Sequence, residues 1–180
     1  MKKKNKRGEK GQFYLLAAII IIMIIITFAA VSNYSKKKDI TRLYALGEEL
    51  EVESMSVLDY GKYSELDETN MTNLLVGFIT AYSDYGDLER IYFIFGNTES
   101  ITVIGYQELI TGEIQVDVGE GISILQITKG SPASEEYSIR GNKVKIIIEG
   151  DEYEFKLESG ENFYFVIYAD VEGETHVVTN

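Results

Sequence analysis

The sequence contains no cysteine, one proline and one histidine among its 180 residues. The absence of cysteine excludes disulfides and every metal or redox site that uses a thiolate. The single histidine, His176, lies near the C-terminal end, where chains tend to fray, so we interpret it as a surface residue of a strand and not as a catalytic base. Because no nucleophile or metal-binding set converges in the sequence, we expect neither an enzyme nor a bound cofactor.

The charge of the chain is divided unevenly between its ends. The formal net charge is −12, yet residues 2–10 carry five lysines and one arginine against Glu9, a local charge of +5. The remainder of the chain therefore carries −17 and would repel phosphate backbones, which proteins bind chiefly through Lys and Arg. We expect no nucleic-acid partner.

Residues 13–31 form an apolar run without a single charge. A helix of this length spans about 28 Å, close to the hydrocarbon thickness of a bilayer. The isoleucine-rich block at residues 19–26 favours a strand in water, but a segment in lipid must satisfy its own backbone and is therefore helical. The larger positive charge before the run predicts a single-pass membrane protein with a cytoplasmic N-terminus and an extracellular C-terminal domain.

Three interpretations of this run stay open. A conventional secretory signal has an apolar region of about 7–15 residues and small residues at the cut, as residues 30–32 would supply. An uncleaved membrane anchor requires only the run itself. The third interpretation depends on the residues that lie just before the run, Lys10-Gly11-Gln12.

The basic leader, the Gly11-Gln12 step and the apolar helix directly after it resemble the class III signal peptide of archaeal type IV pilin-like proteins. The resemblance covers residues 1–33. It implies that a membrane-embedded prepilin peptidase recognises the leader up to Lys10, cuts between Gly11 and Gln12 and leaves the apolar helix on the mature protein. It also implies membrane lipid and like or related pilin subunits as partners. Leu16 stands where many pilins have an acidic residue.

Two helical patterns follow the apolar run. The first is a stripe at intervals of three and four residues, made of Ile40, Leu43, Gly47, Leu50, Ser54 and Val57, with Gly61 as the expected C-terminal cap. We expect this stripe to dock on the chain's own domain, with a coiled-coil seam to a partner as the alternative. The second pattern predicts a helix over residues 70–83, which Asp67 or Thr69 caps and Gly86 ends.

From residue 90 onward the apolar pattern alternates and β-forming residues dominate. The predicted strands cover residues 91–95, 114–118, 122–127, 143–149, 153–157, 163–168 and 171–178. Short glycine-containing breaks separate the last four, which we expect to form an antiparallel meander, with residues 163–168 in the interior of the sheet. Pro132 marks the polar stretch 129–136 as a loop.

The predicted fold class is α+β: a long N-terminal transmembrane helix continues into a head with one short helix and an antiparallel β-sheet. The chain divides into a basic leader peptide (1–11), a transmembrane or filament-core helix (12–34), an amphipathic continuation of the stem (35–61) and an acidic, β-rich extracellular head (62–180).

Few residues of the predicted head are candidates for metal binding or covalent modification. The acidic pairs Asp84/Asp87 and Asp117/Glu120 and the group around Glu149 lie at turns without the spacing of a calcium loop, so we interpret them as solvated carboxylates. Asn70 begins a glycosylation sequon that would matter if the head is exported.

These patterns favour a structural pilin-like surface protein that is cleaved after Gly11 and assembles through its apolar helix. The alternative is an uncleaved, membrane-anchored extracellular binding module. An ectoenzyme is the third hypothesis.

Overall fold

The computed structural model describes residues 7–119, 121–171 and 174–180, without the side chains of residues 7–17, 36 and 38. Its helices are α1 (Arg7–Tyr63) and α2 (Glu68–Gly86). The strands, in chain order, are β1 (Arg90–Gly96), β2 (Ser100–Gln107), β3 (Gly112–Asp117), β4 (Ile122–Ile127), β5 (Ala133–Ser138), β6 (Lys143–Ile148), β7 (Asp151–Lys156), β8 (Asn162–Val171) and β9 (Glu174–Thr179). The chain forms two compact units, Met1–Thr41 and Arg42–Asn180.

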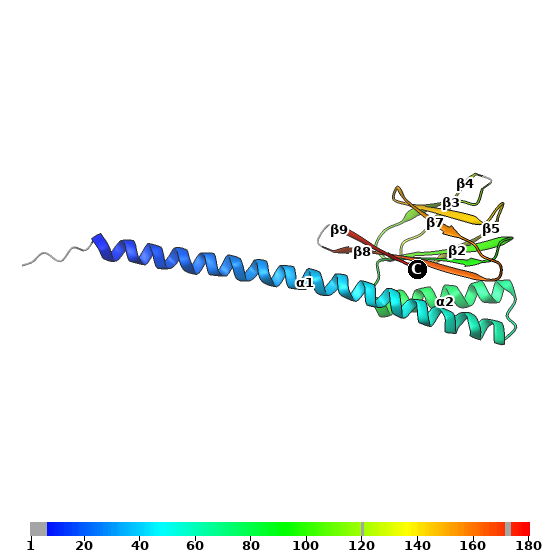
Figure 1. Ribbon diagram of the computed structural model, residues 1–180, viewed down its shortest axis with the longest axis horizontal. Helices are drawn as coiled ribbons and strands as arrows, with labels where there is room; N and C mark the ends of the chain where they lie inside the picture. Colours follow the sequence, from blue (N-terminus) through cyan, green and yellow to red (C-terminus); the bar gives the residue numbers. More distant parts are fainter. Residues whose placement is uncertain (1–6, 120, 172–173) are drawn as a thin grey trace, which may run out of the picture. The chain divides into compact units, whose positions relative to one another are not determined.

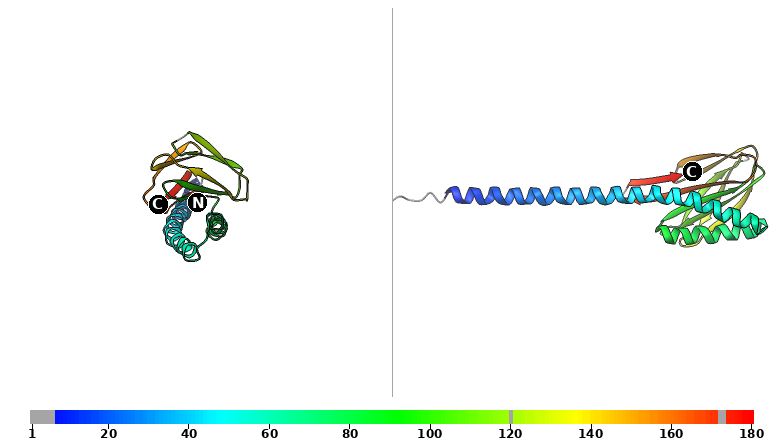
Figure 2. Two further views of the ribbon diagram at one scale, coloured as in Figure 1. Left: turned by 90° about the vertical axis from the view of Figure 1, so that its right-hand side faces the viewer. Right: turned by 60° about the horizontal axis from the view of Figure 1, so that its bottom comes forward.

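The C-terminal unit contains two antiparallel sheets (Figure 1). A five-stranded sheet has the order β5-β2-β1-β8-β9, and a four-stranded sheet has the order β4-β3-β6-β7. Within this unit, the last turns of α1 and the whole of α2 lie side by side on the face of the five-stranded sheet that points away from the four-stranded one (Figure 2). The fold class is therefore α+β, as predicted, but with two sheets in place of one.

The inner strands of the five-stranded sheet are buried on both faces, which explains their apolar composition. In β1, Tyr92 packs between the two sheets, whereas its neighbour Phe93 packs under the helices, and both are fully buried. The neighbouring interior strand β8 alternates in the same way, with Val166 towards the other sheet and Ile167 towards the helices. Strands with two covered faces read as continuous apolar runs, so the prediction that residues 163–168 lie inside a sheet is confirmed.

The predicted stripe on α1 docks on its own domain. Leu43, Gly47, Leu50 and Ser54 are buried in the C-terminal unit, together with Leu46. Gly47 is required there, because a Cβ at this position would lie 2.5 Å from Cγ1 of Val178 on β9.

Helix α2 exceeds the predicted range 70–83 at both ends, and its left-handed C-terminal cap is Asp87, directly after Gly86. The Asp67 side chain accepts a hydrogen bond of 2.8 Å from the backbone N–H of Asn70, and the last helical residue is Gly86. Of the two candidate caps, Asp67 is the one used. The first helix, by contrast, continues past Gly61 to Tyr63. Glycine at residue 61 serves packing and not capping, because a Cβ there would lie 2.4 Å from the Met71 methyl group of α2.

Two strands were missed, and the expected meander is wrong. Residues 129–136 were expected to be a loop, but β5 begins directly after Pro132 and pairs with β2, which was not predicted either. The last four strands form two hairpins in different sheets, β6-β7 and β8-β9. Asn162 directs the chain from one sheet to the other: it accepts a hydrogen bond from the Glu158 N–H at 2.9 Å and donates to the Glu158 carbonyl at 3.0 Å. The apolar β8 gains two covering layers by this crossing.

The docked part of α1 gives a direct stability prediction. Leu50→Ala should lower the free energy of unfolding by about 2–5 kcal/mol, because Leu50 is fully buried and the surrounding core would keep a cavity. Val52→Ala is the matched control two residues away, since Val52 is 67% exposed, and it should change stability by no more than about 0.5 kcal/mol. Urea unfolding of the full chain in detergent, followed by tyrosine fluorescence, measures both. Equal effects would show that this stripe does not belong to the core.

Candidate functional site

The N-terminal unit presents the most unusual surface of the described chain. From Ile19 to Val31 its side chains carry no charge, and the large apolar ones are 41–72% exposed. Within the described residues this is the one helix that is long and apolar enough to cross a membrane. Thr27, the single polar side chain among residues 19–31, donates its hydroxyl to the Met23 carbonyl at 2.8 Å, so it presents no unpaired donor to an apolar surrounding.

The residues predicted for processing and glycosylation lie in different units. Lys10, Gly11 and Gln12 fall within the bounds of α1, and their side chains lie outside the described part of the structure. Asn70 lies in the first turn of α2 and is exposed, so the sequon is at the surface of the C-terminal unit.

His176 and the acidic turns predicted from the sequence can now be placed in the fold. His176 lies on β9 opposite Ala169, and its side chain is 23% exposed. Asp87 is the C-terminal cap of α2, and Asp117 accepts a hydrogen bond from the Gly119 N–H at 2.9 Å. Glu120 lies outside the described residues. Across the described ranges, no group of three or more histidine or acidic residues could hold a metal ion.

Arg90 joins the two sheets, although no sequence pattern marked it. Its guanidinium is 5% exposed and donates to Glu149 at 2.6 Å, at the end of the four-stranded sheet, and to Asp170 at 2.8 Å on β8. It also lies 5.1 Å from the ring centre of Tyr168, within range of a cation–π contact. Burial disfavours its charge, but the two carboxylates outweigh burial and raise its pKa. Arg90 is therefore paired within the fold.

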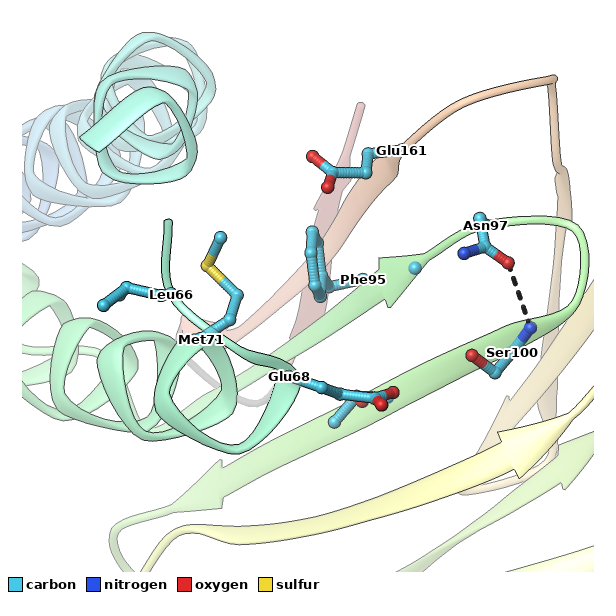
Figure 3. Close-up of a pocket in the computed structure, with 9 residues that line it drawn as sticks. Leu66, Glu68, Met71, Phe95, Asn97, Ser100 and Glu161 are labelled. Atoms are coloured by element: carbon cyan, nitrogen blue, oxygen red, sulfur yellow. Dashed lines mark hydrogen bonds between the residues drawn. The ribbon is translucent and has the colours of Figure 1, made fainter. Parts of the chain in front are cut away.

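A pocket of about 290 Å³ opens beside the start of α2 (Figure 3). Glu68, Phe95 and Glu161 line it, and Glu161 is paired with Lys62 at 2.7 Å. The hydrogen bond and the charge of Glu136 on β5, followed by slight desolvation, raise the pKa of Glu68. The neighbouring carboxyl group of Glu136 is a sufficient cause of this raised pKa, which therefore does not require a ligand.

Comparisons of the chain with models of known protein families, with curated proteins and with solved structures find no match.

The carboxyl pair gives a pH prediction. Because the folded chain holds the Glu68 proton more tightly than the unfolded chain, the pair contributes most to stability below the ordinary glutamate pKa, and this contribution is lost as the pH rises through the raised pKa. Glu136→Gln should lower the pKa of Glu68 towards its ordinary value, as carboxyl ¹³C NMR of the full chain would measure. Glu158→Gln is the control and should leave the Glu68 titration unchanged. An unaltered Glu68 titration in Glu136→Gln would contradict the pairing.

Proposed function

We propose that this chain is a structural, pilin-like surface protein of archaeal type that is cleaved after Gly11 and assembles into filaments through its apolar N-terminal helix. The observation that carries the proposal is the charge-free, exposed helical surface of residues 19–31, which directly follows a basic leader and a Gly-Gln step. Such a surface requires lipid or other apolar helices around it.

The chemistry of the leader supports processing on the cytoplasmic side. Lysines and an arginine at residues 2–10 favour retention of this end on the cytoplasmic side of a membrane. Gly11 has no Cβ and can adopt the extended backbone that a peptidase binds. Cleavage there removes the basic residues and leaves Gln12 at the end of an apolar helix.

The described part of the C-terminal unit supports an extracellular position. Its folded layers bury their apolar side chains without a disulfide, and the chain beyond the leader carries a large negative charge that favours solubility. The charge of +5 before the apolar run exceeds the +3 that residues 36–42 carry after it, and this difference favours an N-terminus inside and a head outside.

An uncleaved, membrane-anchored binding module is the second candidate function. Leu16 favours it, because this residue supplies no carboxylate to pair with the terminal amine of a neighbouring subunit. In this case the apolar helix stays in lipid and the head acts as a monomer.

The N-terminus of the native protein separates the two candidates. If the proposal holds, the mature chain begins at Gln12 or its pyroglutamate and has lost about 1.3 kDa, the mass of the leader. Intact mass and N-terminal peptide analysis of protein from its own membranes would measure this. A native chain that begins at Met1 would support the uncleaved anchor, and one that begins near Asn33 would support a secretory signal; either result contradicts the proposal.

A pair of glycine variants tests the cut itself. Gly11→Val should abolish cleavage, because a β-branched side chain occupies the residue before the scissile bond. Gly8→Val is the matched control, since it adds the same side chain three residues upstream and leaves the Gly11-Gln12 step intact. The shift in mass on a gel or in a spectrum is the readout for both. Normal processing of Gly11→Val would show that the cut does not depend on this step.

A further inference from the structure

A second pocket, of about 310 Å³, lies in the C-terminal unit between the end of β2 and the start of β3. Its lining includes Gln107, Ile110, Gly112, Glu113, Ile147 and Glu149. These residues come from both sheets and from the connection between β2 and β3, so the fold itself builds the pocket.

Gln107, the last residue of β2, leaves an unpaired acceptor at this pocket. The residue is 2% exposed, and its Nε2 donates to the Tyr92 hydroxyl at 2.7 Å. Its Oε1 is buried and has no hydrogen-bond partner among the described residues. A buried polar atom without a partner costs roughly 1–3 kcal/mol, so this oxygen favours any group that brings it a hydrogen-bond donor.

The side-chain amide of Gln107 lies directly against Gly112. A Cβ at residue 112 would lie 2.5 Å from Gln107 Oε1, closer than real contacts allow. The backbone of Gly112 has no left-handed conformation that would by itself demand glycine. The missing side chain therefore leaves room for the Gln107 amide itself in the lining of the pocket.

The charges around the pocket favour a cation. Glu113 and Glu149 are the ionisable residues of the lining. Glu113 accepts a hydrogen bond of 2.9 Å from the side-chain amide of Gln126. Arg90 is the cation beside Glu149, and it is shared with Asp170, so two carboxylates share one guanidinium, and Glu113 has no cation partner among the described residues. An anionic ligand would be repelled here.

The pocket also has an apolar wall. Ile110 is 46% exposed at its edge, and Ile147 of β6 is half-buried. A ligand that fits these walls has a short hydrocarbon stem as well as a charged, donor-bearing end.

We propose that this pocket binds an alkylammonium group, whose N–H donates to Gln107 Oε1 while its methylene groups lie against Ile110 and Ile147. The group can belong to a free diamine or to a lysine side chain of another polypeptide. This binding is independent of leader cleavage and of filament assembly.

Side-chain amide NMR of the full chain in nanodiscs tests the proposal. The sequence has four glutamines, Gln12, Gln107, Gln115 and Gln126, so selective ¹⁵N-glutamine labelling resolves each amide, with Gln12 as an internal reference. Butylammonium, 1,5-diaminopentane and Nα-acetyl-lysine methylamide are the probes. Each should shift the Gln107 amide saturably and leave Gln12 unchanged. The probe that binds more tightly, diamine or lysine derivative, identifies the source of the group.

Two further solutes separate the proposal from simpler explanations. Tetramethylammonium has the charge but no N–H, and acetate has the opposite charge. Neither should shift Gln107. A shift with tetramethylammonium equal to that with butylammonium, a shift with acetate alone, or no shift with any ammonium probe would overturn the proposal, and in the last case water would be the partner of Oε1.

Variants tie the shift to the pocket. Gly112→Ala should abolish the effect, whereas Gly77→Ala, which adds the same methyl group on α2 with no atom within 4 Å, should leave it intact. Glu113→Gln keeps the shape of the side chain and removes its charge, and should weaken binding about two- to fivefold, as expected for an exposed ion pair. Undiminished binding in both Gly112→Ala and Glu113→Gln would place the ligand elsewhere and overturn the proposal.

Discussion

The charge-free surface of α1 is the constraint on which the rest of the account depends. Each isoleucine near the centre of a spanning helix favours insertion by roughly 0.3–0.6 kcal/mol, and residues 19–26 consist of seven isoleucines and one methionine. Eight such residues in water would be an aggregation hazard. Lipid around the helix, or neighbouring helices of the same kind, removes this hazard. The proposed cleavage after Gly11 would allow the helix to move from the lipid into a bundle of such helices.

The last turns of α1 also form part of the hydrophobic core of the C-terminal unit. Leu43, Leu46 and Leu50 complete the layer that covers the outer face of the five-stranded sheet, beside α2. Phe93 and Phe165 of that sheet belong to the same buried cluster as these leucines. The sequence changes accordingly along one helix, from apolar all round at residues 19–31 to apolar on a single stripe after residue 42. The distribution of apolar residues along α1 therefore changes where the helix joins the core of the C-terminal unit.

Periodicity and capping predicted the features that depend on local sequence. The stripe from Leu43 to Ser54, the Asp67 cap and the buried β8 all agree with the structure. The polar β5 was not predictable, because its sequence resembles a loop and it is a strand only through its pairing with β2. The pocket at Gln107 was not predictable from the sequence either. It depends on the contacts of the Gln107 amide with Tyr92 and Gly112, which only the folded structure defines. Lys10, Gly11 and Gln12 stay predictions from sequence.

Incorporation into sheared surface filaments tests most directly what covers the apolar helix. Ile21→Ala with Ile25→Ala removes volume from one face of the helix but keeps it apolar, so membrane insertion and the fold of the head should persist. The control, Ile122→Ala with Ile124→Ala, removes the same groups from exposed sites on β4. The account predicts wild type and control in the sheared extracellular fraction and the helix variant only in the membrane. If wild type and helix variant are both found only as dispersed membrane protein, filament assembly is contradicted and the anchored module is favoured.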